Sequence, residues 1–583
     1  MLETNQDNKI KSFLLVGIFL LVVFVLAVAV WYSPVLFKGY STHVFTTNTL
    51  MGRNVYLTGL YSAENDLNVF LAPSLVKEQG HISAYGNKLT SLIYGKVFKI
   101  TGLPDENNIV LFSIIFHALT LLILTGVVLY LFKFKTAIIF SLVYIFLPFN
   151  WHQPYHLSTY ELSLFFFALF FLFYFWGVKG GVLTEKIQKL SLGRGICLII
   201  SGSFLALAGL SKEAVLLIVP VLFIFLWVKK QRLQLFYIFL PFVVLFGVFW
   251  LPGISNNIYL QFFTTQVSEE IKSADFAFYG HIYPDPYTYH FKQEEYLEDY
   301  KEQLTDESVP LIERVGKAKV LQNMGIQKVG LIDRVKVGLL IIPRHVFRFI
   351  SLEDVGGPFI FLLILLGLYS LRKKNKYLYQ FFVYWILSAI FLMAFVVLAI
   401  RNHLMDFNWA IALLISLGIL ALCKIIIKYF DLKDKKALVV YLIILLAVLY
   451  NLVLVNHVSW SRAYDSSNYL IITAYSQEIK KLNILDQDVI AVDLHPSDLY
   501  YLNYATNKSV VMFTPKTVED LLEENILNDI FKEFKVRYVL GYSDELTKAI
   551  LKQADVVNVA SNSLEPVVPE MSRNKGWLMN LIN

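Results

Sequence analysis

Long apolar runs recur along this chain, and they constrain its fold more than any other feature. A membrane-spanning helix needs about 20 predominantly apolar residues, with a range of roughly 17–25. Runs near this length predict a mainly α, polytopic membrane protein with about eleven spans, of which 136–150, 195–210 and 356–371 are short. The expected spans are 12–33, 108–132, 136–150, 158–177, 195–210, 213–228, 235–252, 356–371, 378–400, 405–427 and 437–456.

The composition fits a chain that faces lipid over much of its length. Hydrophobic residues make up 56% and charged residues 16%, against roughly 25% charged residues in a soluble domain. The net charge is +6, but Lys and Arg stand in short clusters between apolar runs, so we expect no nucleic-acid partner. Cys197 and Cys423 both lie in apolar runs, which favours small buried side chains over a disulfide.

The distribution of Lys and Arg predicts the orientation in the membrane. The run 12–33 is too long for a signal peptide, and no small-residue cleavage site follows it, so we interpret it as a retained first span. With the N-terminus in the cytoplasm, every inside loop is basic, as the positive-inside rule requires. Residues 34–107, 253–355 and 457–583 then lie outside the cytoplasm, and the short outside loops keep only Lys212 and Arg401.

The chain is expected to form two domains. Residues 1–456 form the membrane domain, which includes the outer loops 34–107 and 253–355, and residues 457–583 form a small extracytoplasmic α/β domain. Within the latter, 488–493, 509–513 and 536–541 are short β-branched runs, with a helical pattern over 518–534. Since no glycine-rich nucleotide motif follows any of these runs, we interpret the domain as a docking or acceptor-handling module.

The first outer loop holds the acidic residues Glu64 and Asp66. Amphipathic patterns over 67–77 and 89–100 predict helices that lie along the membrane surface. A carboxylate beside such a helix would stand at the lipid–water boundary, where a lipid-linked substrate presents its phosphate. The alternative is that Asp66 only caps the helix that begins at Leu67.

Two further candidate positions lie at the outer ends of the expected spans 158–177 and 195–210. Glu161 stands at the edge of an apolar run, where a carboxylate is costly unless it faces a cavity or pairs with a cation. The pair Lys212 and Glu213 forms a tight outer turn, in which Lys212 can hold an anionic phosphate and Glu213 can orient it. An interfacial hydrated Glu161 and an ordinary solvated turn are the alternatives.

Arg401 and His403 follow a late span on the outer side. Arg401 opposes the positive-inside trend, and a guanidinium there could grip a phosphate bidentately, although interfacial snorkelling is the alternative. The aromatic stretch 279–290 contains His281, Asp285 and His290. It suits an aromatic lid better than a metal cluster, so no metal ligands are expected.

The order of these features resembles the GT-C superfamily of membrane glycosyltransferases, most closely the branch of protein O-mannosyltransferases and lipid A aminoarabinose transferases. In that family an acidic pair follows the first span and precedes an amphipathic helix that ends near a pair of glycines. Asp66 stands fourteen residues before Gly80, close to the usual interval between those two features. The stretch 208–220 resembles the family's turn with Lys between two spans, and 401–403 its late Arg signature. Glu161 stands where the family has its second acid, but Leu67 replaces a Glu and the alanine-proline after the second acid is missing.

The resemblance, over roughly 12–425, implies transfer of a sugar from a polyprenyl-phosphate donor to a protein, lipid or glycan acceptor outside the cytoplasm. Asp66 would be the general base of an inverting displacement, with Glu161 positioning the acceptor or Lys212. Lys212 and Arg401 would neutralise the leaving phosphate, with Glu64, Glu213 and His403 beside the substrate. No cofactor is required by this scheme, and nothing in the sequence indicates a divalent metal.

Two other functions remain open at the level of sequence. A lipid or glycan transporter would show internal repeats and broken helices at mid-membrane, and no such repeat is visible. A membrane assembly protein would use its outer domains for binding only, so loss of Asp66 would be silent. The absence of a Trp-Trp-Asp motif argues against an oligosaccharyltransferase subunit.

Overall fold

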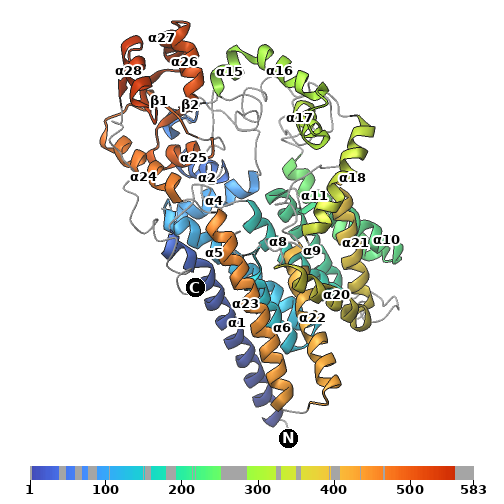
Figure 1. The fold of residues 1–583 in the computed structure, drawn as a ribbon. Coiled ribbons are helices and arrows are strands. Elements are labelled where there is room, and N and C mark those ends of the chain that lie inside the picture. Colours follow the sequence, from blue (N-terminus) through green and yellow to red (C-terminus); the bar gives the residue numbers. More distant parts are fainter. Residues whose placement is uncertain are drawn as a thin grey trace. The chain divides into compact units, whose positions relative to one another are not determined.

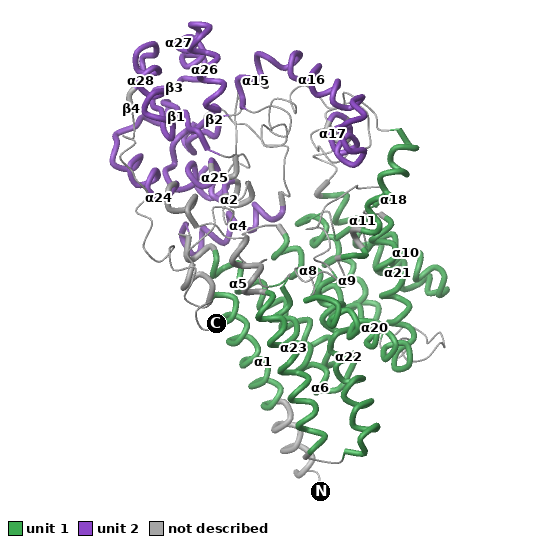
Figure 2. Tube along the Cα trace, viewed as in Figure 1, with its two compact units in different colours: residues 1–37, 107–252, 330–463 green, residues 38–106, 253–329, 464–583 purple. Residues whose placement is uncertain are grey.

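The chain is described from a computed structural model. The described residues are 3–38, 47–58, 69–75, 88–103, 106–148, 150, 159–178, 192–212, 215–216, 218–250, 285–323, 330–348, 356–392, 394–395, 407–432, 435–463, 466–494 and 496–558. They divide into two compact units, each built from three stretches of sequence (Figures 1 and 2). Unit 1 comprises 1–37, 107–252 and 330–463, and unit 2 comprises 38–106, 253–329 and 464–583.

Unit 1 is a bundle of apolar helices. Each of the eleven expected spans coincides with one of them, which confirms the mainly α, polytopic class. They are α1 (Glu3–Lys38), α5 (Glu106–Leu131), α6 (Phe134–Phe146), α8 (Thr159–Gly177), α9 (Leu192–Ser211), α10 (Ile218–Val228), α11 (Arg232–Trp250), α20 (Pro358–Lys374), α21 (Lys376–Leu392), α22 (Asn408–Tyr429) and α23 (Lys435–Ala463). An amphipathic helix, α18 (Leu331–Arg348), precedes α20.

Six of these helices are long and apolar enough to cross a membrane on their own, within the part of the chain that the structure describes. They contain the stretches Leu14–Tyr32, Val110–Leu131, Tyr160–Gly177, Leu192–Ser211, Asn408–Tyr429 and Lys436–Val455. The others are shorter or have a shorter apolar stretch, as expected for α6 and α20. The prediction that the span 195–210 is short is wrong, since α9 has 20 residues and is one of the six. The chain is therefore an integral, multi-pass membrane protein.

Glycines bring the helices of unit 1 into close contact. A Cβ atom on Gly418 of α22 would lie 2.0 Å from the Leu363 carbonyl oxygen of α20, and one on Gly367 would lie 1.9 Å from that of Leu414. The α9–α11 crossing is similar, since a Cβ on Gly202 would lie 2.1 Å from the Ile238 carbonyl oxygen. Small residues at such crossings are typical of helices that pack in lipid, where van der Waals contact replaces the hydrophobic effect.

Unit 2 contains a four-stranded parallel sheet in the order β2-β1-β3-β4. The strands are β1 (Val489–Val492), β2 (Ser509–Met512), β3 (Val536–Leu540) and β4 (Val557–Asn558). The helices that connect or precede them are α24 (Ser466–Lys481), α25 (Pro496–Thr506), α26 (Pro515–Glu523), α27 (Leu527–Glu533) and α28 (Asp544–Gln553). The expected α/β domain is therefore present, with the three expected strands in place and the helical pattern 518–534 divided between α26 and α27.

Most of the two outer loops, residues 38–106 and 253–329, belongs to the same unit as the C-terminal α/β domain, whereas residues 330–355, which include α18, belong to unit 1. From the first loop come α2 (Thr47–Thr58), the segment 69–75 and α4 (Lys88–Thr101), and from the second come α15 (Pro286–Phe291), α16 (Gln293–Thr305) and α17 (Leu311–Asn323). Val69, Leu71 and Tyr287 enter the hydrophobic core beneath the sheet, beside Val511 and Phe513. The domain expected at 457–583 thus shares its core with segments that were expected to belong to the membrane domain.

One expectation for the first outer loop holds and another is wrong. The helix expected over 89–100 is α4, and it ends at Gly102, whose φ of +80° suits a glycine C-cap. The helix expected over 67–77 does not form in its described part. Phe70 instead forms an antiparallel bridge with Val510 of β2, and only residues 73–75 are helical.

Candidate functional site

The helices α8 and α9 form an antiparallel pair whose register is fixed by direct contacts. Near the start of α8, the Ser163 hydroxyl donates to the Ala208 carbonyl oxygen at 3.0 Å. In the middle, the Ser201 hydroxyl donates to the Phe170 carbonyl oxygen at 3.1 Å. At the end of α8, a Cβ on Gly177 would lie 2.7 Å from the Leu198 side chain. The start of α8 therefore lies beside the end of α9.

This register brings the candidate residues Glu161 and Lys212 to the same end of the pair. Glu161 lies in the first turn of α8 and has no exposed surface. Lys212 follows the last residue of α9, and its backbone N–H donates to the Ala208 carbonyl oxygen at 2.9 Å. Its ammonium group lies 5.3 Å from the centroid of the Tyr160 ring, in range of a cation–π interaction. Tyr160, which the sequence analysis did not single out, thus orients Lys212 at the end of the pair where Glu161 lies.

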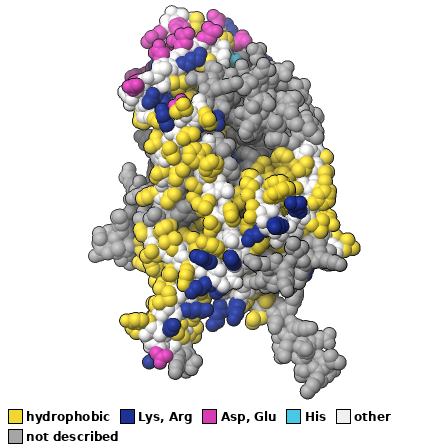
Figure 3. Space-filling model, turned by 90° about the vertical axis from the view of Figure 1, so that its right-hand side faces the viewer, with side chains coloured by type: hydrophobic (Ala, Val, Ile, Leu, Met, Phe, Trp, Pro, Cys, Tyr) yellow, Lys and Arg dark blue, Asp and Glu magenta, His cyan; other side chains and the backbone are white. Residues whose placement is uncertain are grey.

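Basic residues of several loops gather at the other end of the bundle. The start of α9, which carries Arg194, lies one helix length from Lys212, or about 30 Å for 20 residues. Lys374 lies close enough to Lys133 and Lys424 for electrostatic repulsion, and Lys229 donates to Gln380 at 2.5 Å. On the face drawn in Figure 3, many Lys and Arg side chains gather below broad hydrophobic areas. Lys212 therefore stands apart from the main group of cations of unit 1.

The arrangement of Glu161, Tyr160 and Lys212 combines a buried carboxylate with an oriented cation at the end of two apolar helices. Charged groups in such surroundings are costly and mark substrate or ion sites more often than ordinary structure. A half-buried ammonium of this kind can bind an anion such as a phosphate. Within the described ranges, no group of three or more His, Cys, Asp or Glu side chains is arranged to hold a metal ion.

Five of the seven candidate residues lie outside the described residues: Glu64, Asp66, Glu213, Arg401 and His403. His281 lies outside them as well.

A buried amide pair near the start of α22 was missed by the sequence analysis. The Asn408 side chain donates to Asn150 Oδ1 at 2.7 Å, and Asn150 in turn donates to the Tyr144 carbonyl oxygen at 2.9 Å. Both asparagines follow a Phe and precede a Trp in the sequence, in otherwise apolar surroundings, and this repeated tripeptide was the available signal. The pair fixes the start of α22, and Arg401 stands seven residues before Asn408 in the sequence.

The start of α22 lies beside the middle of α8 and does not reach the end of α8 that carries Glu161. The Phe407 ring packs tilted against that of Trp385 with a centroid distance of 4.3 Å, and Trp385 contacts Phe167 and Phe171 of α8 at 5.8 Å. Phe167 and Phe171 follow Glu161 by six and ten residues, which is about 9–15 Å along a helix. Helix α22 therefore begins level with the middle of α8, about 9–15 Å along α8 from Glu161.

His117 is a second polar residue that the sequence analysis passed over. It lies in α5 with no exposed surface, with its ring 4.6 Å from that of Trp31 and 5.8 Å from that of Tyr144. Neither ring nitrogen has a hydrogen-bond partner among the described residues. An ionisable residue inside the apolar run 108–132 was the signal for it.

The stretch 279–290 is described from Asp285 onward, and this part forms neither a lid nor a metal site. Asp285 caps α15, since its Oδ1 accepts from the Thr288 backbone N–H at 2.9 Å and its Oδ2 from that of Thr514 at 3.4 Å. Burial raises the pKa of the Asp285 carboxyl, while these hydrogen bonds oppose the shift. Tyr287 packs into the core of unit 2 and is 4% exposed, so it serves folding.

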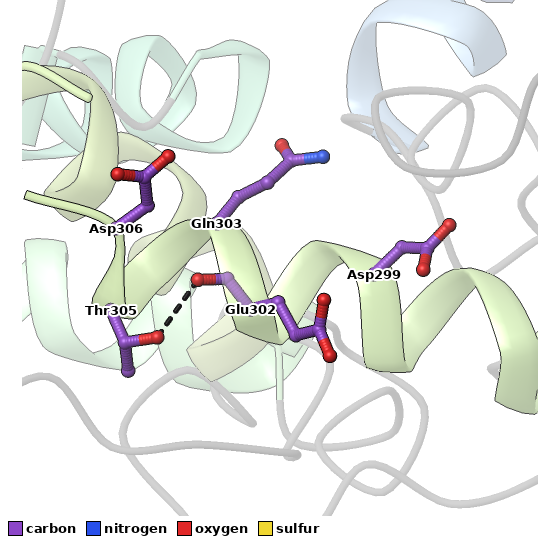
Figure 4. Close-up of a pocket in the computed structure, with 5 residues that line it drawn as sticks. All are labelled: Asp299, Glu302, Gln303, Thr305 and Asp306. Atoms are coloured by element: carbon purple, nitrogen blue, oxygen red, sulfur yellow. Dashed lines mark hydrogen bonds between the residues drawn. The ribbon is translucent and has the colours of Figure 1, made fainter. Parts of the chain in front are cut away.

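A hollow of about 450 Å³ lies against α16 and is lined by Asp299, Glu302, Gln303, Thr305 and Asp306 (Figure 4). All five side chains are exposed, and the Thr305 hydroxyl is bonded to the Glu302 carbonyl oxygen at 2.9 Å. Exposed carboxylates on a helix surface are solvated and hold a ligand weakly. The hollow therefore lacks the buried, oriented groups found at Glu161 and Lys212.

Two known structures share this fold with TM-scores of 0.52 and 0.50, and a third aligns with a lower score. The archaeal oligosaccharyltransferase AglB from Archaeoglobus fulgidus, in complex with an inhibitory peptide and a dolichol-phosphate, aligns over 92% of this chain and 71% of its own, with a TM-score of 0.52 and 13% identity. Its apo form aligns over 89% and 69% with a TM-score of 0.50 and 14% identity. ArnT from Cupriavidus metallidurans bound to undecaprenyl phosphate aligns over 92% and 89%, with a TM-score of 0.38 and 10% identity.

No protein-family model matches the sequence, and no curated protein matches it either. The resemblance to the GT-C superfamily is nevertheless confirmed at the level of the fold, since the AglB structures belong to the GT-C membrane glycosyltransferases.

Proposed function

We propose that this chain is a membrane glycosyltransferase that moves a sugar from a polyprenyl-phosphate carrier to an acceptor outside the cytoplasm. The observation that carries the proposal is that the buried Glu161 and the oriented Lys212 lie at the same end of the α8–α9 pair in a GT-C bundle. The dolichol-phosphate named in the AglB complex is the kind of anionic lipid that such a cation can bind.

The distribution of charge supports the orientation. The basic residues gathered around Lys374 and Arg194 mark the cytoplasmic end of unit 1. Glu161 and Lys212 then face the opposite side, where the substrate would meet them. The N-terminus of α1 would be cytoplasmic, and the C-terminal α/β domain would be extracytoplasmic.

The reaction is a single displacement at the anomeric carbon. The acceptor hydroxyl oxygen forms a bond to that carbon while the bond from the carbon to the phosphate oxygen breaks, which inverts the configuration. Asp66 takes the hydroxyl proton as general base, and polyprenyl phosphate leaves with the electron pair of the broken bond. Lys212 and Arg401 neutralise the charge that develops on the phosphate.

The remaining candidates support these groups. Glu213 orients Lys212, His403 contributes to the phosphate site beside Arg401, and Glu161 positions the acceptor or Lys212. Glu64 lies near the base in sequence and is the alternative proton acceptor. Because fixed cations stabilise the leaving phosphate, the scheme needs no metal ion.

The test is turnover of a donor by the purified protein in nanodiscs. A panel of radiolabelled polyprenyl-phosphate sugars is supplied with envelope extract as the source of acceptor, and release of free polyprenyl phosphate is measured. Asp66→Asn should be slower than wild type by about 10² or more, within the usual contribution of a general base, whereas the matched control Asp299→Asn, at an exposed position of α16, should turn over normally. Equal rates for wild type and Asp66→Asn would move the base to Glu64 or Glu161, and no donor use by wild type would contradict the function.

A further inference from the structure

Helix α2 of the first outer loop is joined to the C-terminal α/β domain by a buried guanidinium. Arg53 has no exposed surface. Its Nη1 donates to the Asn503 carbonyl oxygen at 2.7 Å and to Asn507 Oδ1 at 3.1 Å, and its Nη2 donates to Asn503 Oδ1 at 2.7 Å. Nε and Nη2 also donate to Asn54 Oδ1 at 3.1 and 3.0 Å. All five N–H groups of the guanidinium are therefore engaged.

The same Asn503 side chain also holds the segment 69–75. Its Nδ2 donates to the carbonyl oxygens of Phe70 and Leu71, both at 3.0 Å, and to that of Lys508 at 2.8 Å. Its Oδ1 meanwhile accepts from Arg53. One amide on α25 thus bonds to two parts of the first outer loop that are separated in sequence by residues 59–68.

The segment 69–75 is fixed to the edge of the sheet as well. The backbone N–H of Phe70 donates to the Val510 carbonyl oxygen at 2.9 Å, and Val510 returns the bond at 2.9 Å. The Ala72 N–H donates to the Ser509 hydroxyl at 3.0 Å, and the Phe70 ring meets that of Tyr500 edge-on at 5.1 Å. The segment therefore acts as an additional short strand beside β2.

The positive charge of Arg53 restricts where α2 can lie on the C-terminal α/β domain. Burial lowers the pKa of Arg53 to about 9, so the guanidinium is still charged at neutral pH. The acceptors named above are neutral amide and carbonyl oxygens, and the Tyr504 ring lies 5.7 Å away. A buried charge is tolerated only when its hydrogen bonds are made, so α2 has few alternative positions once Arg53 is buried against Asn503.

We propose that Asn503 and Arg53 are positioning residues that fix both ends of residues 59–68 on the C-terminal α/β domain and thereby limit where Asp66 can present its carboxylate. The proposal rests on the proposed role of Asp66 as the base. Three peptide units separate Asp66 from Val69, or at most about 11 Å between their Cα atoms, so the anchor acts close to that residue. The α/β domain would then serve the reaction by limiting the reach of the residue proposed as the base.

The experiment uses the full-length protein in nanodiscs and the variant Asn503→Asp. A carboxylate keeps the acceptor for Arg53 and removes the donor to the carbonyl oxygens of Phe70, Leu71 and Lys508, so α2 should stay in place while the segment 69–75 is released. Backbone amide exchange at Phe70 and Ala72 should become about tenfold faster or more, as expected when a short strand loses two hydrogen bonds. This measurement does not depend on any enzymatic activity.

Transfer kinetics supply the second readout. In Asn503→Asp we expect kcat to fall by roughly 10- to 100-fold, because small displacements of a catalytic group are this costly, while KM for the donor stays within about twofold. The matched control Asn528→Asp makes the same substitution on α27, where Asn528 Oδ1 accepts, among the described residues, only from the Asp555 N–H at 3.2 Å. Ile550→Ala, in the buried face of α28, controls for loss of domain stability alone. Both controls should leave kcat nearly unchanged.

The outcomes separate the two proposals. Unchanged exchange at Phe70 and Ala72 would refute the anchoring role of Asn503. Faster exchange with an unchanged kcat, or a loss of kcat no greater than that of Ile550→Ala, would refute positioning. If wild type transfers no sugar, the proposed function fails, and the exchange rates alone still decide whether Asn503 holds the loop.

Discussion

The interaction between Tyr160 and Lys212 yields the most detailed prediction. If Lys212 binds the leaving phosphate, Lys212→Gln removes one charge-assisted contact, worth about 1.5–3 kcal/mol. Since about 1.4 kcal/mol corresponds to a factor of ten, kcat/KM for the lipid donor should fall by about 10- to 150-fold. Folding should persist, because Lys212 is only half-buried and lies beyond the last turn of α9.

Tyr160 should act through Lys212. The ammonium lies 5.3 Å from the ring centroid, and a cation–π contact at this range is worth about 0.5–2 kcal/mol, depending on how far it is desolvated. Tyr160→Leu should therefore lower kcat/KM by about 2- to 30-fold. Tyr160→Phe keeps the aromatic face and is the matched control, with an expected loss of less than about threefold.

The double variant Tyr160→Leu with Lys212→Gln decides whether Tyr160 acts through Lys212. Initial rates of polyprenyl phosphate release are measured in proteoliposomes over a range of donor concentrations. With Lys212 already replaced, Tyr160→Leu should cost nothing further, because its contribution depends on the ammonium. Fully multiplicative losses would refute the coupling, and a rate for Lys212→Gln within twofold of wild type would remove Lys212 from the phosphate site.

Two other predictions concern the frame of the site. Gly418→Ala should destabilise the bundle by about 1–3 kcal/mol or more, because the new methyl would lie 2.0 Å from the Leu363 carbonyl oxygen; an unchanged thermal unfolding temperature in nanodiscs would contradict this packing. Asp486 should make unit 2 lose stability in acid, because hydrogen bonds from Lys508 and Ser74 hold the pKa of the Asp486 carboxyl below its usual 3.8. A carboxyl with a depressed folded pKa stabilises above the unfolded pKa, and that contribution is lost as the pH falls through the folded pKa. Asp486→Asn should cost about 0.2–1 kcal/mol at pH 7 and progressively less as the pH falls below 3.8 and through the lowered folded pKa. A difference in unfolding temperature that stays constant through the acid range would refute the assignment.

Much of the fold could be predicted because its signals are local. Each apolar run is long enough to identify a helix wherever it packs, and the three β-branched runs around β1, β2 and β3 lie between clear helical patterns. The strand β4 has only two residues, which is too short for any periodicity.

The segment 67–77 was predicted wrongly because its pattern is compatible with either structure. Its apolar residues fit one face of a helix, but Phe70 pairs with Val510, which lies 440 residues further along the chain. A partner so distant in sequence overrides local propensity and leaves no local trace. Arg53 and Asn503 were missed for the same reason, since each is an ordinary polar residue in its own segment.

The candidate site could be predicted only in part. Glu161 and Lys212 were found because a charge in or beside an apolar run is unusual, and the contacts between α8 and α9 bring them to one end of the pair. Tyr160 and the pair of Asn150 and Asn408 carry no charge, so nothing in the hydropathy pattern marked them.

Retention of the lipid carrier tests the central claim most directly, because it requires neither the sugar nor the acceptor to be known. Native mass spectrometry of the purified protein would be recorded with undecaprenyl phosphate or dolichol phosphate in the presence of excess phosphatidylglycerol. The account predicts one polyprenyl phosphate retained by wild type and at least a tenfold weaker retention by Lys212→Gln, in line with the loss of a charge-assisted contact. No preference of wild type for polyprenyl phosphate over phosphatidylglycerol would contradict the account.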